Sequence, residues 1–206
     1  MSQRNRRDFL RVSGAGALAL GSTMATSAPA RAGSEPGQGP PRVAVLDIVP
    51  THKLYNTVTR EFATAYWHWF FLIQPAPLPE TVLSTNAEFF INRAFGRAAP
   101  GVFTKEAVDA YLRAFRDPAT IHAGCEDYRA AATIDLAHDD ADIGRKISCT
   151  VLALWAAKGP MSRLYNVLEA WRERAANVTG KALPGGHFLP EEVPDETYVE
   201  LKAFLG

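Results

Sequence analysis

The sequence predicts an α/β domain whose parallel sheet is interrupted by a block of helices. Val43–Leu46 and Cys149–Trp155 are short apolar runs without alternation, a pattern typical of strands covered on both faces. Between them, from Thr51 to about Asp142, apolar residues recur at helical spacing. Since two β/α pieces flank this block, we expect one domain with a helical insertion.

Local signals place the remaining elements. In the insertion we expect helices at Leu54–Ile73, Thr81–Phe95, Thr104–Phe115 and Pro118 to about Thr133. Thr104 is placed to start the third of these helices, and Asp117 opens the fourth. After the second strand we expect a helix at Ser162–Ala176, a strand at Val178–Leu183 and a final helix that Asp195 caps and that ends at Leu205.

The N-terminus has the parts of a twin-arginine export signal in the correct order. Arg6-Arg7 is followed by a weakly apolar stretch from Val12 to Thr26, and then by small residues up to Ala32 that fit an A-x-A cleavage pattern. We therefore predict a cleaved signal over residues 1–32, a Gly/Pro-rich linker over 33–42, and a mature chain in the periplasm or outside the cell. No later stretch is long and apolar enough to span a membrane.

Composition argues against several classes of site. The chain has 22 basic and 22 acidic side chains, and the predicted signal holds five of the bases and one of the acids. The remaining 17 bases and 21 acids give a net charge of −4, which argues against nucleic acid binding. Cys125 and Cys149 are too few for a disulfide framework, and we expect each as a small buried apolar group. A structural zinc site is not expected, because no CxxC pair or close His/Cys cluster occurs. We expect no metal or other cofactor.

Two polar residues follow predicted strands. Asp47 closes the first strand, at the edge where ligands gather in open α/β sheets, and could orient a histidine by accepting its ring N–H. A loop-capping aspartate is the alternative. His187 follows Gly185-Gly186 after the last strand and could act as a general base, since histidine exchanges protons near neutral pH. An ordinary loop histidine is the alternative here.

The densest aromatic run of the sequence is Tyr66 to Phe71. It predicts either a helix buried in the insertion or a polar pocket into which His68 and Trp69 aim N–H groups. Tyr128 could add an O–H to such a pocket. An indole N–H only donates hydrogen bonds, so these groups would suit an anion such as a departing halide.

Four motifs together resemble the haloacetate (fluoroacetate) dehalogenases of the α/β-hydrolase fold. They are Val43 to Ile48, His68 to Glu80, Cys125 to Arg129 and Gly186 to Glu192, in the family's order. The resemblance runs from Val43 to Gly206. It implies a partial α/β-hydrolase fold, with core segments at 43–50 and 147–206 and a helical cap at 51–146.

The resemblance also implies a reaction and the residues that serve it. In this family an aspartate displaces halide from a 2-haloacid and forms an ester, which a histidine-activated water then hydrolyses. His187 matches the histidine and Asp47 the acid that orients it. His68, Trp69 and Tyr128 match the donors that stabilise halide, and the partner would be a small haloacid.

The sequence departs from the family before the first predicted strand. The family's nucleophile lies on a sharp turn upstream of the strand that ends in Asp47, where this sequence has the predicted linker and signal. We therefore expect a truncated fold without the attacking carboxylate, so enzymatic activity of the chain alone stays in question. The strand at Val43–Ile48 would have an open edge. The chain would then fold poorly, or pair with a second copy or a complementing chain.

Two other functions remain open at this point. The first is another α/β hydrolase, an epoxide hydrolase or esterase, because a cap tyrosine such as Tyr128 also serves to open epoxides. The second is an exported protein without catalytic activity.

Overall fold

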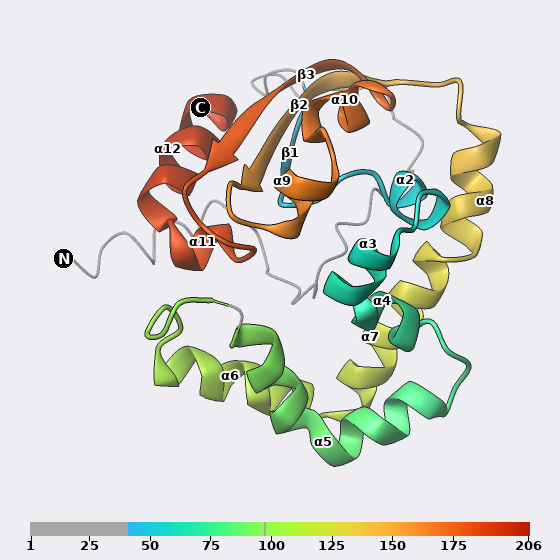
Figure 1. The fold of residues 1–206 in the computed structure, drawn as a ribbon, viewed down its shortest axis with the longest axis vertical. Coiled ribbons are helices and arrows are strands. Elements are labelled where there is room, and N and C mark those ends of the chain that lie inside the picture. The colour runs from blue at the N-terminus through green and yellow to red at the C-terminus, as the bar shows by residue number, and fades with distance from the viewer. Residues whose placement is uncertain (1–40, 97) are drawn as a thin grey trace, which may run out of the picture.

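The computed structural model describes residues 41–96 and 98–206 (Figure 1). The predicted export signal and most of the predicted linker lie outside these residues, so the export signal stays a prediction. Within the described residues, no helix combines the length and the apolar character needed to cross a membrane.

A three-stranded parallel sheet forms the core of the described fold. Its strands are β1 (Arg42–Leu46), β2 (Ile147–Ala156) and β3 (Ala175–Leu183), in the order β1-β2-β3. Val45 of β1 lies opposite Ala153 of β2, and Ala153 lies opposite Gly180 of β3. The prediction of a parallel sheet is confirmed.

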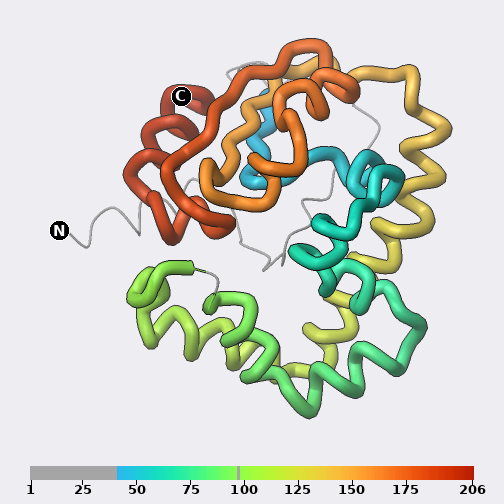
Figure 2. The backbone as a smooth tube through the Cα atoms, viewed as in Figure 1, coloured from blue at the N-terminus to red at the C-terminus, as the bar shows by residue number. Residues whose placement is uncertain are grey.

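The segment between β1 and β2 is helical and turn-rich in the part of the chain that the structure describes, as the sequence predicts. Its helices are α2 (Thr51–Asn56), α3 (Arg60–Ala65), α4 (Trp67–Leu72), α5 (Leu78–Phe95), α6 (Lys105–Phe115), α7 (Pro118–Ala131) and α8 (Ile134–Ala141). Figure 2 shows the chain leaving β1, passing through α5 and α6 at the end of the molecule remote from the sheet, and returning to β2 along α8. We call these helices the helical insertion.

Side-chain caps set the two helix starts that the sequence predicts in this insertion. The Thr104 hydroxyl accepts a hydrogen bond from the Ala107 N–H at 3.2 Å and begins α6. The Asp117 carboxylate accepts from the Ala119 N–H at 2.9 Å and begins α7. Each bond satisfies an N–H that has no partner inside the helix.

The prediction of one long helix at Leu54–Ile73 is wrong. Three short helices, α2 to α4, occupy this segment. The Thr59 hydroxyl accepts from the Phe62 N–H at 3.0 Å and starts a new helix, and Tyr66 leaves the helical conformation between α3 and α4. Apolar spacing continues through both breaks, because each short helix still packs one face on the same core.

The prediction of one helix at Ser162–Ala176 is also wrong. The segment forms α9 (Pro160–Leu164) and α10 (Val167–Arg172), and β3 begins at Ala175. Tyr165 is extended, and the Asn166 side chain accepts from the Glu169 N–H at 3.3 Å to cap α10. A local cap therefore interrupts a segment whose apolar residues keep helical spacing.

The last two helices follow β3. They are α11 (Leu189–Glu192) and α12 (Pro194–Leu205). The prediction that Asp195 caps the final helix is wrong, because Val193 is the N-cap residue and no side chain caps this end. Asp195 lies inside the first turn of α12, where its negative charge interacts favourably with the positive end of the helix dipole and stabilises the helix.

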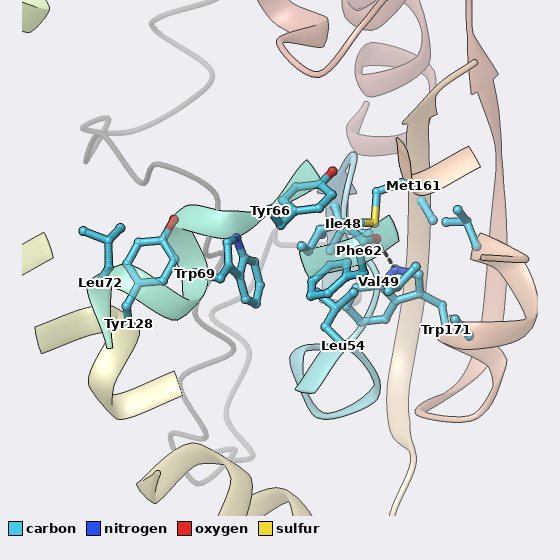
Figure 3. Close-up of a cluster of buried hydrophobic side chains, with 14 of the residues drawn as sticks. Ile48, Val49, Leu54, Phe62, Tyr66, Trp69, Leu72, Tyr128, Met161 and Trp171 are labelled. Atoms are coloured by element: carbon cyan, nitrogen blue, oxygen red, sulfur yellow. Dashed lines mark hydrogen bonds between the residues drawn. The ribbon is translucent and has the colours of Figure 1, made fainter. Parts of the chain in front are cut away.

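The sheet is covered on both faces, as the apolar strand pattern predicts. On one face Val45, Val151 and Ala153 pack with the helical insertion and with α9 and α10, and Figure 3 shows part of this cluster. On the other face Leu152 and Leu154 pack with side chains of α11 and α12.

The two cysteines are free thiols. Cys125 is buried in α7, and burial raises the pKa of its thiol to about 11. Cys149, in β2, is only half-buried, so the expectation of two buried cysteines holds for Cys125 alone.

Candidate active site

Asp47 sits immediately after β1 in a left-handed backbone conformation, with φ of 49°. The residue is 1% exposed. The Asp47 N–H donates to the Leu154 carbonyl at 2.7 Å, and its Oδ1 accepts from the Ala156 N–H at 2.9 Å. Aspartate tolerates this conformation better than most residues, since its short polar side chain bonds locally. The carboxylate is therefore fixed at the carboxyl ends of β1 and β2.

His187 meets this carboxylate from the loop after β3. The distance from His187 Nδ1 to Asp47 Oδ2 is 2.7 Å, across 140 positions of sequence. An ionised carboxylate only accepts hydrogen bonds, so Nδ1–H is the donor, and in the neutral form of the ring this leaves the lone pair on Nε2. The His187 side chain is 22% exposed, whereas that of Asp47 is fully buried. The pair that the sequence predicts is brought together, in an arrangement able to take a proton from water.

The three predicted anion donors also lie close together. The Trp69 and Tyr128 rings are 5.7 Å apart, and the His68 and Tyr128 rings 6.2 Å apart, centroid to centroid. Trp69 is 1% exposed, and its indole N–H is buried without a hydrogen-bond partner among the described residues. Figure 3 shows the indole nitrogen and the Tyr128 hydroxyl pointing to the same side.

The Tyr66 ring lies between these donors and His187, a position that the sequence did not indicate. Its ring centroid lies 6.3 Å from that of His187, 6.0 Å from that of His68 and 6.3 Å from that of Trp69. The Tyr66 hydroxyl points to the same side as the indole nitrogen of Trp69 (Figure 3). The only sequence signal for Tyr66 is its place at the start of the aromatic run.

The chain is similar to hydrolases of known sequence and structure. A fluoroacetate dehalogenase from Burkholderia sp is 43% identical over 166 residues, which make up 79% of this chain and 55% of that protein. A solved structure of a candidate α/β hydrolase from Nostoc sp PCC 7120 is 55% identical, with a TM-score of 0.77, over 80% of this chain and 57% of that one. No protein-family model matches the chain.

A third similar protein is named for a different activity. The structure of a candidate epoxide hydrolase from Pseudomonas aeruginosa is 38% identical, with a TM-score of 0.74. The match covers 80% of this chain and 56% of that one. The chain has a partial α/β-hydrolase fold. It spans about half the length of the curated relative it matches, 55%.

Within this α/β-hydrolase fold, burial keeps two tyrosines protonated beside Trp69. Burial raises the pKa of the Tyr128 hydroxyl, and the neighbouring Tyr55 and Asp127 raise it further. Burial also raises the pKa of Tyr55, whose ring lies 5.5 Å from that of Trp69, to about 12. Tyr128 is thus an O–H donor throughout the neutral range.

Alkaline titration should show these two tyrosines separately from the rest. In the folded chain they stay neutral above pH about 10, where exposed tyrosines ionise. In the unfolded chain these tyrosines lose their protons there, whereas in the folded chain they keep them. The free energy of unfolding therefore decreases as pH rises above about 10, and below that pH the raised pKa values do not change it. Tyr55→Phe and Tyr128→Phe should each remove part of the late absorbance change. Tyr198→Phe, on α12, should not, and a late component unaffected by either buried variant would contradict the assignment.

One cluster in the helical insertion has metal-ligand spacing. Glu80, His122 and Glu126 present ligand atoms within 4.8 Å of one another. However, the Arg129 guanidinium donates to Glu80 at 2.8 Å and to Glu126. The Arg129 cation therefore already pairs with both carboxylates, and the cluster joins α5 to α7.

Proposed function

We propose that this chain supplies the base and the anion-binding part of a hydrolase that removes halide from a 2-haloacid such as haloacetate. Two features support the proposal. The Burkholderia relative is named a fluoroacetate dehalogenase. The indole N–H of Trp69 is the observation that carries it, because it is buried and has no hydrogen-bond partner in the part of the chain that the structure describes, and such a donor favours a ligand that accepts hydrogen bonds.

The proposed reaction has two steps. A carboxylate attacks the α-carbon of the haloacid, the carbon–halogen bond breaks, and halide leaves with the bonding pair toward Trp69, His68 and Tyr128. His187 Nε2 then takes a proton from water, whose oxygen attacks the ester carbonyl. The bond between the carbonyl carbon and the ester oxygen breaks, and the departing alkoxide takes the proton from His187 and leaves as the hydroxy acid. The attacking carboxylate is restored when its acid form loses a proton to water. Asp47 holds the histidine and stabilises its charged form.

We propose that the attacking carboxylate comes from outside the described residues. Asp47 is the carboxylate that the described structure bonds to His187, and it lies on Nδ1, away from the ring nitrogen that would activate water. We therefore propose that a complementing chain or segment supplies the nucleophile. The 206-residue chain alone should then release no fluoride from fluoroacetate above the buffer rate.

Adding the part of the Burkholderia relative that this chain does not match should restore fluoride release, measured with a fluoride electrode. Turnover by the chain alone would contradict the external nucleophile. Failure of the combined proteins to release fluoride, with both shown to be folded and bound to each other, would contradict the dehalogenase proposal.

Halide binding can be tested without turnover. Titration with bromide should quench part of the tryptophan fluorescence in a saturable way, because the anion would sit on the Trp69 indole. Trp69→Phe should abolish the saturable part. Trp67→Phe, a matched control on the exposed side of the same helix, should retain it. Equal saturable quenching in the Trp69→Phe variant would rule out this anion site.

Epoxide hydrolysis is the second candidate, favoured by the likeness to the candidate epoxide hydrolase of Pseudomonas aeruginosa and by the Tyr128 hydroxyl. An epoxide oxygen would take the place of the halide and accept from that O–H. Supplying styrene oxide instead of fluoroacetate to the complemented protein distinguishes the two. A third candidate, an exported protein without activity, predicts no turnover of either substrate.

A further inference from the structure

The backbone of the loop that carries His187 is bonded by the carboxylate of Glu192. Glu192, the last residue of α11, lies five positions after the histidine. Its Oε2 accepts from the Gly186 N–H at 3.0 Å, and its Oε1 accepts from the Phe188 N–H at 3.0 Å. One side chain thus binds the backbone immediately before and immediately after His187.

The space at Gly186 shows how closely this carboxylate approaches the loop. A Cβ atom at Gly186 would lie 2.7 Å from each Glu192 carboxylate oxygen, closer than real contacts allow. Since the carboxylate is the end of a flexible side chain, an added Cβ would push it away from the two N–H groups that it binds.

Residues after His187 contact the helical insertion. The Phe188 ring packs against Phe95 and Phe103 of the helical insertion, with centroids 5.7 and 5.2 Å away. Glu191, next to Glu192, accepts from the Tyr111 hydroxyl of the insertion at 3.1 Å. These contacts hold the loop and α11 against the insertion, whereas the two Glu192 bonds fix the peptide groups on both sides of the histidine.

We propose that Glu192 is a positioning residue for His187. Charge-assisted bonds to two flanking amides restrict the histidine to side-chain rotation, and this keeps Nδ1 at 2.7 Å from Asp47. Glu192 acts through the backbone and touches neither substrate nor the reacting atoms. The inference rests on the proposed role of His187 as the base.

The test follows the His187 Nδ1 proton by nuclear magnetic resonance of the full chain with nitrogen-labelled histidine, assigned through its loss in His187→Gln. Glu192→Ala removes two hydrogen bonds, so it should speed the exchange of this proton with water at least tenfold, since about one lost hydrogen bond already corresponds to a factor of about ten. Glu192→Gln, which keeps the size and one acceptor oxygen, should give an intermediate rate. It also serves if the alanine variant fails to fold.

Glu191→Ala is the matched control, because it removes a neighbouring carboxylate of the same helix that does not bond to the backbone beside the histidine. It should lower the melting temperature without changing the exchange of the His187 proton. Exchange within twofold of the unmodified chain in both Glu192 variants, at a lowered melting temperature, would reduce Glu192 to a purely structural role. A rapidly exchanging Nδ1 proton in the unmodified chain would instead overturn the Asp47–His187 pair itself.

Discussion

Replacing Gly180 with alanine should leave the chain unable to form its sheet. Gly180 lies in β3 with φ of 151°, opposite Ala153 of β2. A Cβ there would be 1.8 Å from the Ala153 carbonyl oxygen and 2.7 Å from its carbon. Both are backbone atoms of the central strand and cannot move without breaking the β2–β3 pairing. We expect a loss of more than about 4 kcal/mol, in the range where single substitutions unfold a domain.

Gly124→Ala is the control for this experiment. Gly124 lies inside α7, where an added Cβ would meet no heavy atom within 4 Å. Alanine is favoured over glycine inside a helix, so this variant should gain about 0.5–1 kcal/mol. Urea unfolding followed by circular dichroism measures both. A Gly180→Ala chain that unfolds at the urea concentration of the unmodified chain would contradict the close approach of the two strands.

Two substitutions of Asp47 should distinguish its effect on the stability of the fold from its effect on proton transfer by His187. Asp47→Ala leaves the buried Ala156 N–H and the histidine without their acceptor and places alanine at a positive φ. The expected loss is about 2–5 kcal/mol, with about 1–3 kcal/mol from the unpaired N–H and about 1–2 kcal/mol from the backbone conformation.

Asp47→Asn should be nearly as stable as the unmodified chain, because asparagine accepts this conformation and keeps the oxygen that binds Ala156. Its amide nitrogen would instead donate to His187 Nδ1, so the ring proton would move to Nε2 and the histidine could no longer take a proton from water. Nitrogen chemical shifts of the imidazole report this tautomer. A proton that stays on Nδ1 in the asparagine variant would contradict the carboxylate's role in orienting the ring.

The sequence anticipated those parts of the fold that depend on local chemistry. Thr104 and Asp117 start helices as their side chains require, and the apolar strands lie in a parallel sheet. The breaks at Thr59 and Tyr165 were not anticipated. Apolar spacing alone does not distinguish one long helix from several short ones that pack on the same core.

Some residues of the candidate site could be predicted from the sequence, and others could not. Asp47 and His187 follow strands, so their meeting could be expected from the order of a parallel sheet. Tyr66 and Glu192 could not be selected from sequence, because their importance depends on distances to the His187 ring and loop that only the folded chain defines. Aromatic and acidic residues are common, and nothing local distinguishes these two.

During synthesis on the ribosome, the residues that Asp47 binds are made long after Asp47 itself. Asp47 and Ala156 are 109 positions apart, and Asp47 and His187 are 140 apart. At typical translation speeds β1 therefore waits on the order of ten seconds before β2 has been synthesised. During that interval this apolar strand has no neighbour from β2, and of the described residues only the emerging helical insertion can cover it. Among the described strands, the one that ends in the candidate catalytic acid is thus the one that stays unpaired longest.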